Sequence, residues 1–391
     1  MEITDTLKEK FYELFGEDGK KPRLFFAPGR VNLIGEHTDY NGGYVFPCAL
    51  NYGTYLMARE TEEPEIKLAS VNFDYKAFIL PEDLNKKHNG EWVEYPLGVI
   101  DQMKKRGINP SRLELMYSGD IPNGAGLSSS ASIELVTAFM LSTLYGKNIP
   151  MIELVILSQK AENEFVGMNC GIMDQFAVGM GQANSALFLN CDTLDYELVP
   201  VKLNDYRLII TNTNKRRGLT DSKYNERRSE CEKAVEYISK TKPVRNLSEI
   251  SLADFEEIKH LIPDDIIRKR AHHVISENAR VLEAIPALKS GNTEKLGELM
   301  NRSHDSLRDD YEVTGFELDT LVAEARKIEG CIGSRMTGAG FGGCTVSLVH
   351  KESVNNFIEN VGKNYFDKIG LSAVFYQPEI GDGPREIAME K

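Results

Sequence analysis

The first half of the chain mixes short apolar runs with glycine-rich turns, a pattern typical of β-strands joined by tight loops. The apolar runs predict strands at 24–27, 44–47, 54–58, 66–71, 113–117, 186–189 and 208–211. Apolar residues at helical spacing predict two long helices, 129–145 and 151–165, and a shorter amphipathic helix near the start of the chain. The helix over 129–145 starts with serine and is followed by Gly146, as helix ends commonly are.

The second half is mostly helical in pattern. Helical apolar spacing predicts helices at 221–239, 266–288, 293–307, 316–327 and 353–368, and 333–349 reads as a glycine-rich loop followed by a strand. Helices and strands are interspersed without regular alternation, so the fold class expected is α+β. The change in texture near residue 200 predicts two domains, 1–200 and 201–391.

Composition excludes several classes of protein. The 391 residues carry 46 Lys and Arg against 59 Asp and Glu, a formal net charge of −13, which argues against a nucleic-acid partner. The six cysteines are scattered and form no C-x-x-C pair, which favours reduced thiols over disulfides or zinc. The acidic first 15 residues do not resemble a signal peptide, and no apolar run reaches the ~20 residues of a membrane span. We therefore expect a cytoplasmic protein with no membrane partner.

The richest candidate site is the glycine-bracketed segment 27–43, which contains Arg30, Glu36, His37 and Asp39. Short acceptors and donors on a sharply turning backbone suit a ligand with many hydroxyl groups. From local composition alone, a solvated surface turn is an equally good interpretation.

A second segment, 122–132, places glycines immediately before the predicted helix at 129–145. The unpaired N–H groups at a helix start form an anion site that suits a phosphate chain. The hydroxyls of Ser129, Ser130 or Ser132 could either cap the helix or reach a metal ion. A serine-capped helix after a plain loop is the alternative.

Two further segments carry weaker signals. Gly338, Gly340 and Gly343 satisfy G-x-G-x-x-G, but a strand rather than a helix is predicted after them, which argues against a dinucleotide-binding site. Asp174 lies among small and apolar residues and reads by itself as a loop or capping residue.

Taken together and in this order, segments 29–43, 124–131 and 338–343 resemble the galactokinases of the GHMP small-molecule kinase superfamily. The resemblance implies a two-domain GHMP-kinase-like fold with the active site in the interdomain cleft. It implies transfer of the γ-phosphoryl of ATP to the C1 hydroxyl of α-D-galactose, giving α-D-galactose 1-phosphate and ADP in galactose catabolism, with Mg²⁺ as the metal.

The resemblance also assigns expected roles to residues. Arg30 and Asp174 match the catalytic pair, and the sugar-binding positions are Glu36, His37, Asp39, Gly171 and Tyr224. The expected nucleotide-binding residues are Gly124, Ala125, Gly126, Leu127, Ser128, Ser129, Ser130, Trp92 and Tyr95. Ser130 and Glu162 match the magnesium positions.

Several alternatives stay open from the sequence. Asp174 could act as a general base, or Arg30 could activate the hydroxyl electrostatically while Asp174 orients the sugar. The chain could phosphorylate a related sugar such as N-acetylgalactosamine, or be a non-catalytic galactose sensor, although the intact pair Ser130-Ala131 argues against a sensor. We expect a monomer that binds only the small-molecule substrate and ATP.

Overall fold

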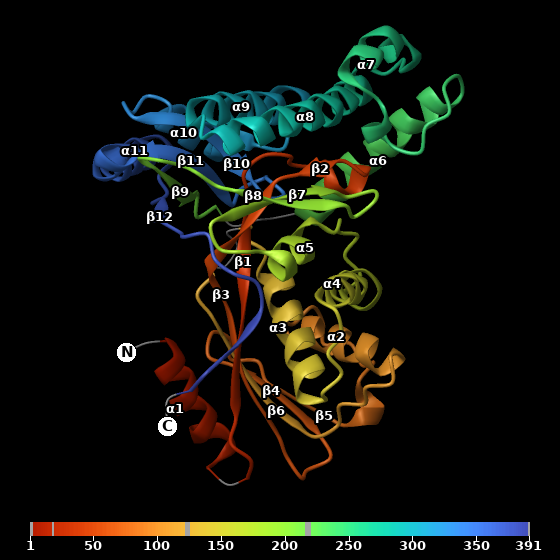
Figure 1. Ribbon diagram of the computed structural model, residues 1–391, viewed down its shortest axis with the longest axis vertical. Helices are drawn as coiled ribbons and strands as arrows, with labels where there is room; N and C mark the ends of the chain where they lie inside the picture. The colour runs from red at the N-terminus through yellow and green to blue at the C-terminus, as the bar shows by residue number, and fades with distance from the viewer. Residues whose placement is uncertain (1–2, 18, 122–125, 216–219, 390–391) are drawn as a thin grey trace.

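The computed structural model describes residues 3–17, 19–121, 126–215 and 220–389. Its lower part in Figure 1 is a mixed six-stranded sheet with helices on both faces. The strands, in sheet order, are β13 (Arg385–Ile387), β1 (Arg23–Asn32), β3 (Pro47–Glu60), β6 (Leu113–Gly119), β4 (Ile66–Ser70) and β5 (Ala77–Ile79). All neighbours are antiparallel except β4 and β6, which run parallel.

Two sets of helices cover this sheet. One face carries α2 (Glu94–Lys105), α3 (Ser129–Leu144), α4 (Met151–Lys160) and α5 (Met173–Met180). The other face carries α1 (Ile3–Phe15), whose Leu7 and Phe11 are buried against Met57 and Met116 of the sheet. The N-terminal amphipathic helix predicted from the sequence is thereby confirmed.

The upper part of the molecule is built around a second, four-stranded sheet. Its strands are, in order, β10 (Cys331–Thr337), β11 (Cys344–His350), β9 (Tyr206–Asn212) and β12 (Val374–Tyr376). The accompanying helices are α6 (Thr220–Ser239), α7 (Leu252–Ile258), α8 (Asp265–Ser290), α9 (Thr293–Ser306), α10 (Gly315–Ala325) and α11 (Val354–Ile369). A three-stranded sheet, β2 (Tyr44–Val45), β7 (Ser185–Asn190) and β8 (Tyr196–Pro200), lies between the two parts (Figure 1).

The observed elements confirm the α+β fold class, and the long periodic segments are helices as predicted. The run at 44–47 contains the short strand β2 (Tyr44–Val45), and the run at 54–58 lies inside β3 (Pro47–Glu60), which is longer than predicted. The predicted helix 151–165 changes at residue 161 from α-helix to the π-helical turn η3 (Ala161–Val166), which contains Glu162.

The prediction for 333–349 is partly wrong, because its first five residues belong to strand β10. Gly333 made this segment look like a loop, but its lack of a side chain serves packing. A Cβ on Gly333 would lie 2.5 Å from the Cα of Gly297 on α9, so the glycine allows this helix to lie close to the sheet. Among the described residues, no helix is both long and apolar enough to cross a membrane.

Candidate active site

A cavity of about 250 Å³ lies where the two parts of the chain meet. Residues from the first half and from α6 and the β10–β11 turn line it together. It collects predicted residues that are up to 194 positions apart (224 − 30): Arg30, Glu36, His37, Asp39, Tyr95, Ser130, Glu162, Gly171, Asp174 and Tyr224. The proposed sugar, catalytic and metal positions therefore converge on one space.

Arg30 on β1 and Asp174 on the first turn of α5 form an ion pair at the wall of this cavity. The Nη2 and Nε groups of Arg30 donate to Oδ1 of Asp174 at 2.6 and 2.9 Å. Oδ2 of the same carboxylate accepts from Ser128 Oγ at 2.5 Å, and Arg30 Nη1 donates to the carbonyl of Gly126 at 2.7 Å. The pair is thus fixed directly against the segment that precedes α3.

Asp39 faces Gly171 with no room for a side chain between them. A Cβ on Gly171 would lie 1.9 Å from Oδ2 of Asp39, so only glycine fits there. Burial, followed by the negative charges of Asp174 and Glu36, raises the pKa of Asp39 to about 7. In the ligand-free protein this carboxyl group therefore takes up a proton near neutral pH.

His37 lies at the floor of the cavity among aromatic rings, with a positive φ of 62°. Its Nδ1 is 2.8 Å from the hydroxyl of Tyr40, which is 2.7 Å from the hydroxyl of Tyr311. The ring of Tyr224 lies 5.8 Å from that of His37, centroid to centroid. Burial and the nearby His273 lower the pKa of His37 to about 3, so the imidazole is neutral.

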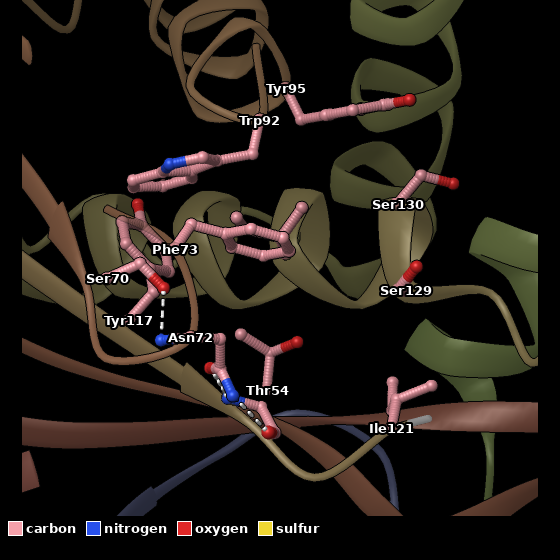
Figure 2. A pocket seen from close by; sticks show the side chains of 12 residues that line it. Thr54, Ser70, Asn72, Phe73, Trp92, Tyr95, Tyr117, Ile121, Ser129 and Ser130 are labelled. Atoms are coloured by element: carbon pink, nitrogen blue, oxygen red, sulfur yellow. Dashed lines mark hydrogen bonds between the residues drawn. The ribbon is translucent and has the colours of Figure 1, made fainter. Parts of the chain in front are cut away.

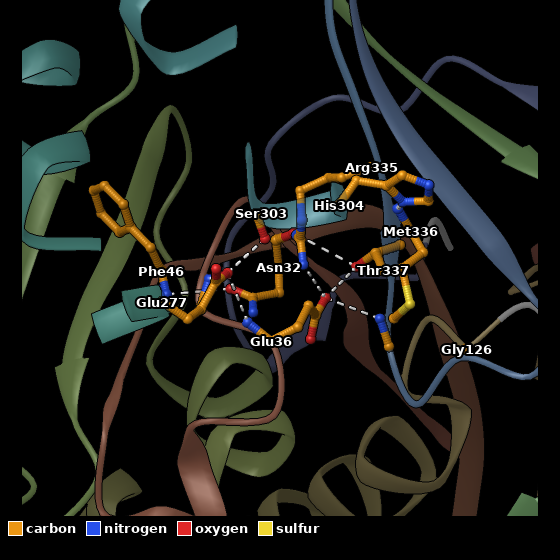
Figure 3. A network of polar contacts seen from close by, with 12 residues as sticks. Asn32, Glu36, Phe46, Gly126, Glu277, Ser303, His304, Arg335, Met336 and Thr337 are labelled. Carbon is orange, nitrogen blue, oxygen red and sulfur yellow. Dashed lines mark hydrogen bonds and ion pairs between the residues drawn. The ribbon is translucent and has the colours of Figure 1, made fainter. Parts of the chain in front are cut away.

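Glu36 connects the first half of the chain to β10, a role that the sequence did not predict. Its Oε1 accepts from the hydroxyl of Thr337 and the N–H of Gly338, both at 2.9 Å, and lies 3.2 Å from Nη2 of the fully buried Arg335 (Figure 3). Behind it, Glu277 Oε1 accepts from the N–H of Gly35 at 2.9 Å. Glu36, one of the acidic residues that line the cavity, is therefore held by the second sheet.

Glu162 and Ser130 lie beside the ion pair and are hydrogen-bonded to each other. Burial, and then the charge of Asp174, raises the pKa of Glu162 to about 7. A carboxylate and a hydroxyl oxygen are ligand types that Mg²⁺ accepts, and a bound cation would offset this concentration of negative charge. The described residues hold no group of three or more His, Cys, Asp or Glu side chains arranged for a metal, so phosphate oxygens or water would have to complete the shell.

The segment directly before α3 is where the sequence predicts an anion site. Gly124 and Ala125 lie outside the described residues. Leu127 accepts a hydrogen bond from the N–H of Arg30 through its carbonyl, and Ser128 has a φ of +62°. Gly338 packs against this segment, since a Cβ there would lie 3.0 Å from the carbonyl oxygen of Gly126. The second and third glycine-rich segments are therefore in contact.

A second cavity, of about 190 Å³, adjoins the first and shares Tyr95 and Ser130 with it. Trp92 and Phe73 line it with rings tilted by only 20° and centroids 6.4 Å apart (Figure 2). The indole N–H of Trp92 donates to the carbonyl of Tyr75 at 3.0 Å, which fixes the ring. Ser129 lines the same space at the start of α3.

Sequence reasoning missed several residues of both cavities. Phe73, Asn72 and Tyr117 line the second cavity, and Arg335 and Thr337 support the first. The aromatic residues near 73 carried a detectable signal, since they lie in a polar loop where burial does not explain them. Arg335 gave no signal, because its role depends on pairing between segments that are remote in sequence.

Three models of known protein families match the chain. Residues 9–60 match the galactokinase galactose-binding signature, residues 94–182 the N-terminal domain of GHMP kinases, and residues 284–368 the GHMP kinase C-terminal domain. Galactokinases of Clostridium beijerinckii and Enterococcus faecalis are 51% and 50% identical to it, covering 99% and 98% of this chain and all of their own length.

Two solved structures are similar to this chain over most of its length. The crystal structure of Lactococcus lactis galactokinase complexed with galactose matches with a TM-score of 0.96 and 46% identity, over 99% of this chain and 100% of that one. Mevalonate kinase of Methanococcus jannaschii shares the fold, with a TM-score of 0.68 at 20% identity, over 93% of this chain and 100% of that one.

Proposed function

The chain belongs to the galactokinase family of GHMP kinases and is an ATP-dependent kinase for galactose, and we propose that its two adjoining cavities bind the two substrates. Galactose occupies the cavity of Arg30 and Asp174, and ATP lies along the start of α3. The observation that carries this proposal is the Arg30–Asp174 pair, which lines the first cavity and is held against Ser128 and Gly126 directly before α3.

In this proposal Asp174 accepts the proton of the C1 hydroxyl of galactose. An alcohol is a weak acid, so the proton moves late, once the bond from oxygen to the γ-phosphorus has begun to form. Arg30 orients Asp174 and offsets charge at the reacting oxygen. Two of its three donor nitrogens reach Oδ1 and the third reaches the carbonyl of Gly126, a planar arrangement that a lysine ammonium could not reproduce.

The remaining residues of the first cavity bind the other hydroxyl groups of the sugar. Glu36 and Asp39 are acceptors, neutral His37 offers a ring nitrogen, and Tyr224 supplies a hydroxyl and an aromatic face. Gly171 contributes its backbone in a position where a side chain would displace Asp39.

For the nucleotide, we propose that Trp92 and Tyr95 hold the adenine, and that Gly124, Ala125, Gly126, Leu127, Ser128, Ser129 and Ser130 surround the phosphates. Ser130 and Glu162 would hold Mg²⁺, which when bound neutralises phosphate charge. We further propose that the active unit is a monomer.

The test is release of ADP in a coupled assay with galactose, N-acetylgalactosamine, arabinose and galacturonate as acceptors. We expect kcat/KM to be highest for galactose. A higher value for another sugar would overturn the sugar assignment, and binding of galactose without ADP release would indicate a sensor.

A further inference from the structure

Gln175, the residue after Asp174, is fully buried and donates to two carboxylates at once. Its Nε2 lies 2.6 Å from Oε2 of Glu162 and 3.0 Å from Oε2 of Glu134. The exposed fractions of Gln175 and Glu134 are both 0%. None of the roles described above uses this amide or Glu134.

The arrangement connects three elements around one carboxylate. Glu134 lies one helical turn after Ser130 on α3, Glu162 lies in the π-helical turn η3, and Gln175 lies on α5. Glu162 is therefore held from two directions, by the hydroxyl of Ser130 and by the amide of Gln175. Glu134 in turn fixes the amide, because it accepts the second hydrogen bond.

The contacts of this network are incomplete in a way that favours a functional role. Among the described atoms, Oε1 of Glu134 and Oε1 of Gln175 are buried without a hydrogen-bond partner. Unsatisfied buried acceptors cost free energy, and well-packed apolar side chains of similar volume are often at least as stabilising. Packing alone is therefore a poor reason for an amide and a carboxyl group here.

We propose that Gln175 and Glu134 are positioning residues that orient the carboxylate of Glu162 toward the divalent cation and so set the affinity for that cation. The proposal rests on the metal role of Glu162 proposed above. Hydrogen-bonded partners of metal ligands commonly contribute about 10–100-fold to metal affinity.

The experiment measures the dissociation constant of a non-hydrolysable ATP analogue by the fluorescence of Trp92, the single tryptophan, with Mn²⁺ and with EDTA. The constant in EDTA divided by the constant with Mn²⁺ is the ratio that reports how much the metal tightens nucleotide binding. Electron paramagnetic resonance of Mn²⁺ reports the environment of the metal. We expect Gln175→Met to lower this ratio by about tenfold or more. The constant in EDTA and the affinity for galactose should change by less than about threefold, because neither depends on the metal.

The variant Glu162→Gln separates the two proposals. It should lower the ratio strongly, and Gln175→Met should add nothing in that background. An unchanged ratio in Glu162→Gln would refute the metal role of Glu162 itself. A strong effect of Glu162→Gln with none for Gln175→Met, or a further loss in the double variant, would overturn the positioning role.

A matched pair at Glu134 gives an independent decision if Gln175→Met does not fold. Glu134→Gln keeps a side-chain oxygen for the amide and should keep the ratio within about threefold, whereas Glu134→Leu should lower it. Equal ratios in these two variants would overturn the proposal.

Discussion

Asp39 shows how the cavity changes the chemistry of a single side chain. Its pKa is raised from 3.8 to about 7, so between these values the folded protein holds a proton that the unfolded chain releases. The contribution of Asp39 to the free energy of unfolding therefore falls as pH rises through this window. Asp39→Asn removes the titrating group and its share of the slope.

We accordingly expect Asp39→Asn to gain stability relative to the parent protein as pH rises from 5 to 7, by at most about 1.4 kcal/mol per pH unit. Urea unfolding at pH 5, 6 and 7 without ligand measures the difference. Parallel profiles for the two proteins would contradict the raised pKa.

Asp174→Asn tests the proposed base. We expect kcat to fall by about 100-fold or more, because a general base commonly contributes 10²–10⁴-fold and an amide cannot take the proton. Galactose binding, measured by calorimetry, serves as the control for folding. A kcat within about tenfold of the parent, near 1.4 kcal/mol, would instead favour activation by Arg30.

At the level of individual residues, the sequence was most informative where chemistry is concentrated in short segments. Arg30, Glu36, His37 and Asp39 lie within ten positions, and the structure brings all of them to one cavity. Arg335 could not be predicted, because nothing local distinguishes a buried arginine in a strand from an exposed one.

At the level of elements, hydrophobic periodicity predicted the long helices, whose buried faces repeat over several turns. It missed α2, α5 and α7, which have 12, 8 and 7 residues. Helix α5 has only eight residues and is buried on most sides, so little polar face remains to give a period. Strand β13 has three residues, and its place is set by pairing with β1 rather than by its own pattern.

The contact between Glu36 and β10 predicts a large stability effect from one substitution. Arg335→Met leaves the buried Glu36 carboxylate without its cation, and we expect a loss of about 3–5 kcal/mol in the free energy of unfolding. Lys351→Met removes an ion pair with Asp205 that is exposed at the surface, and should cost less than about 1 kcal/mol. Urea unfolding of both variants measures the contrast, and similar losses would contradict it.

At the level of the whole molecule, a net charge of −13 first suggests a poor partner for ATP. The net charge of the whole chain does not prevent ATP binding, because the potential at the site is set by nearby groups. A helix start, backbone N–H groups and Arg30 provide positive potential where the nucleotide would lie. The acidic residues near Ser130 would repel the phosphates, so a cation is still needed to offset their negative charge.

Nucleotide binding should therefore depend strongly on Mg²⁺. We expect EDTA to weaken binding of a non-hydrolysable ATP analogue by at least about tenfold, followed as a change in Trp92 fluorescence. Denaturation profiles with and without EDTA control for unfolding. Binding that is equally tight in EDTA would contradict this charge balance.

The pairing of β13 with β1 also bears on how the protein is made. Strand β13, which covers the outer edge of β1, begins 353 residues after β1 ends (385 − 32). During synthesis this edge of β1 is therefore unpaired until almost the whole chain has been made. Unpaired strand edges are templates for association with other chains. On the ribosome, the edge of β1 at Leu24, Phe25 and Phe26 is therefore a place where the nascent chain can pair with another chain and where a chaperone would protect it.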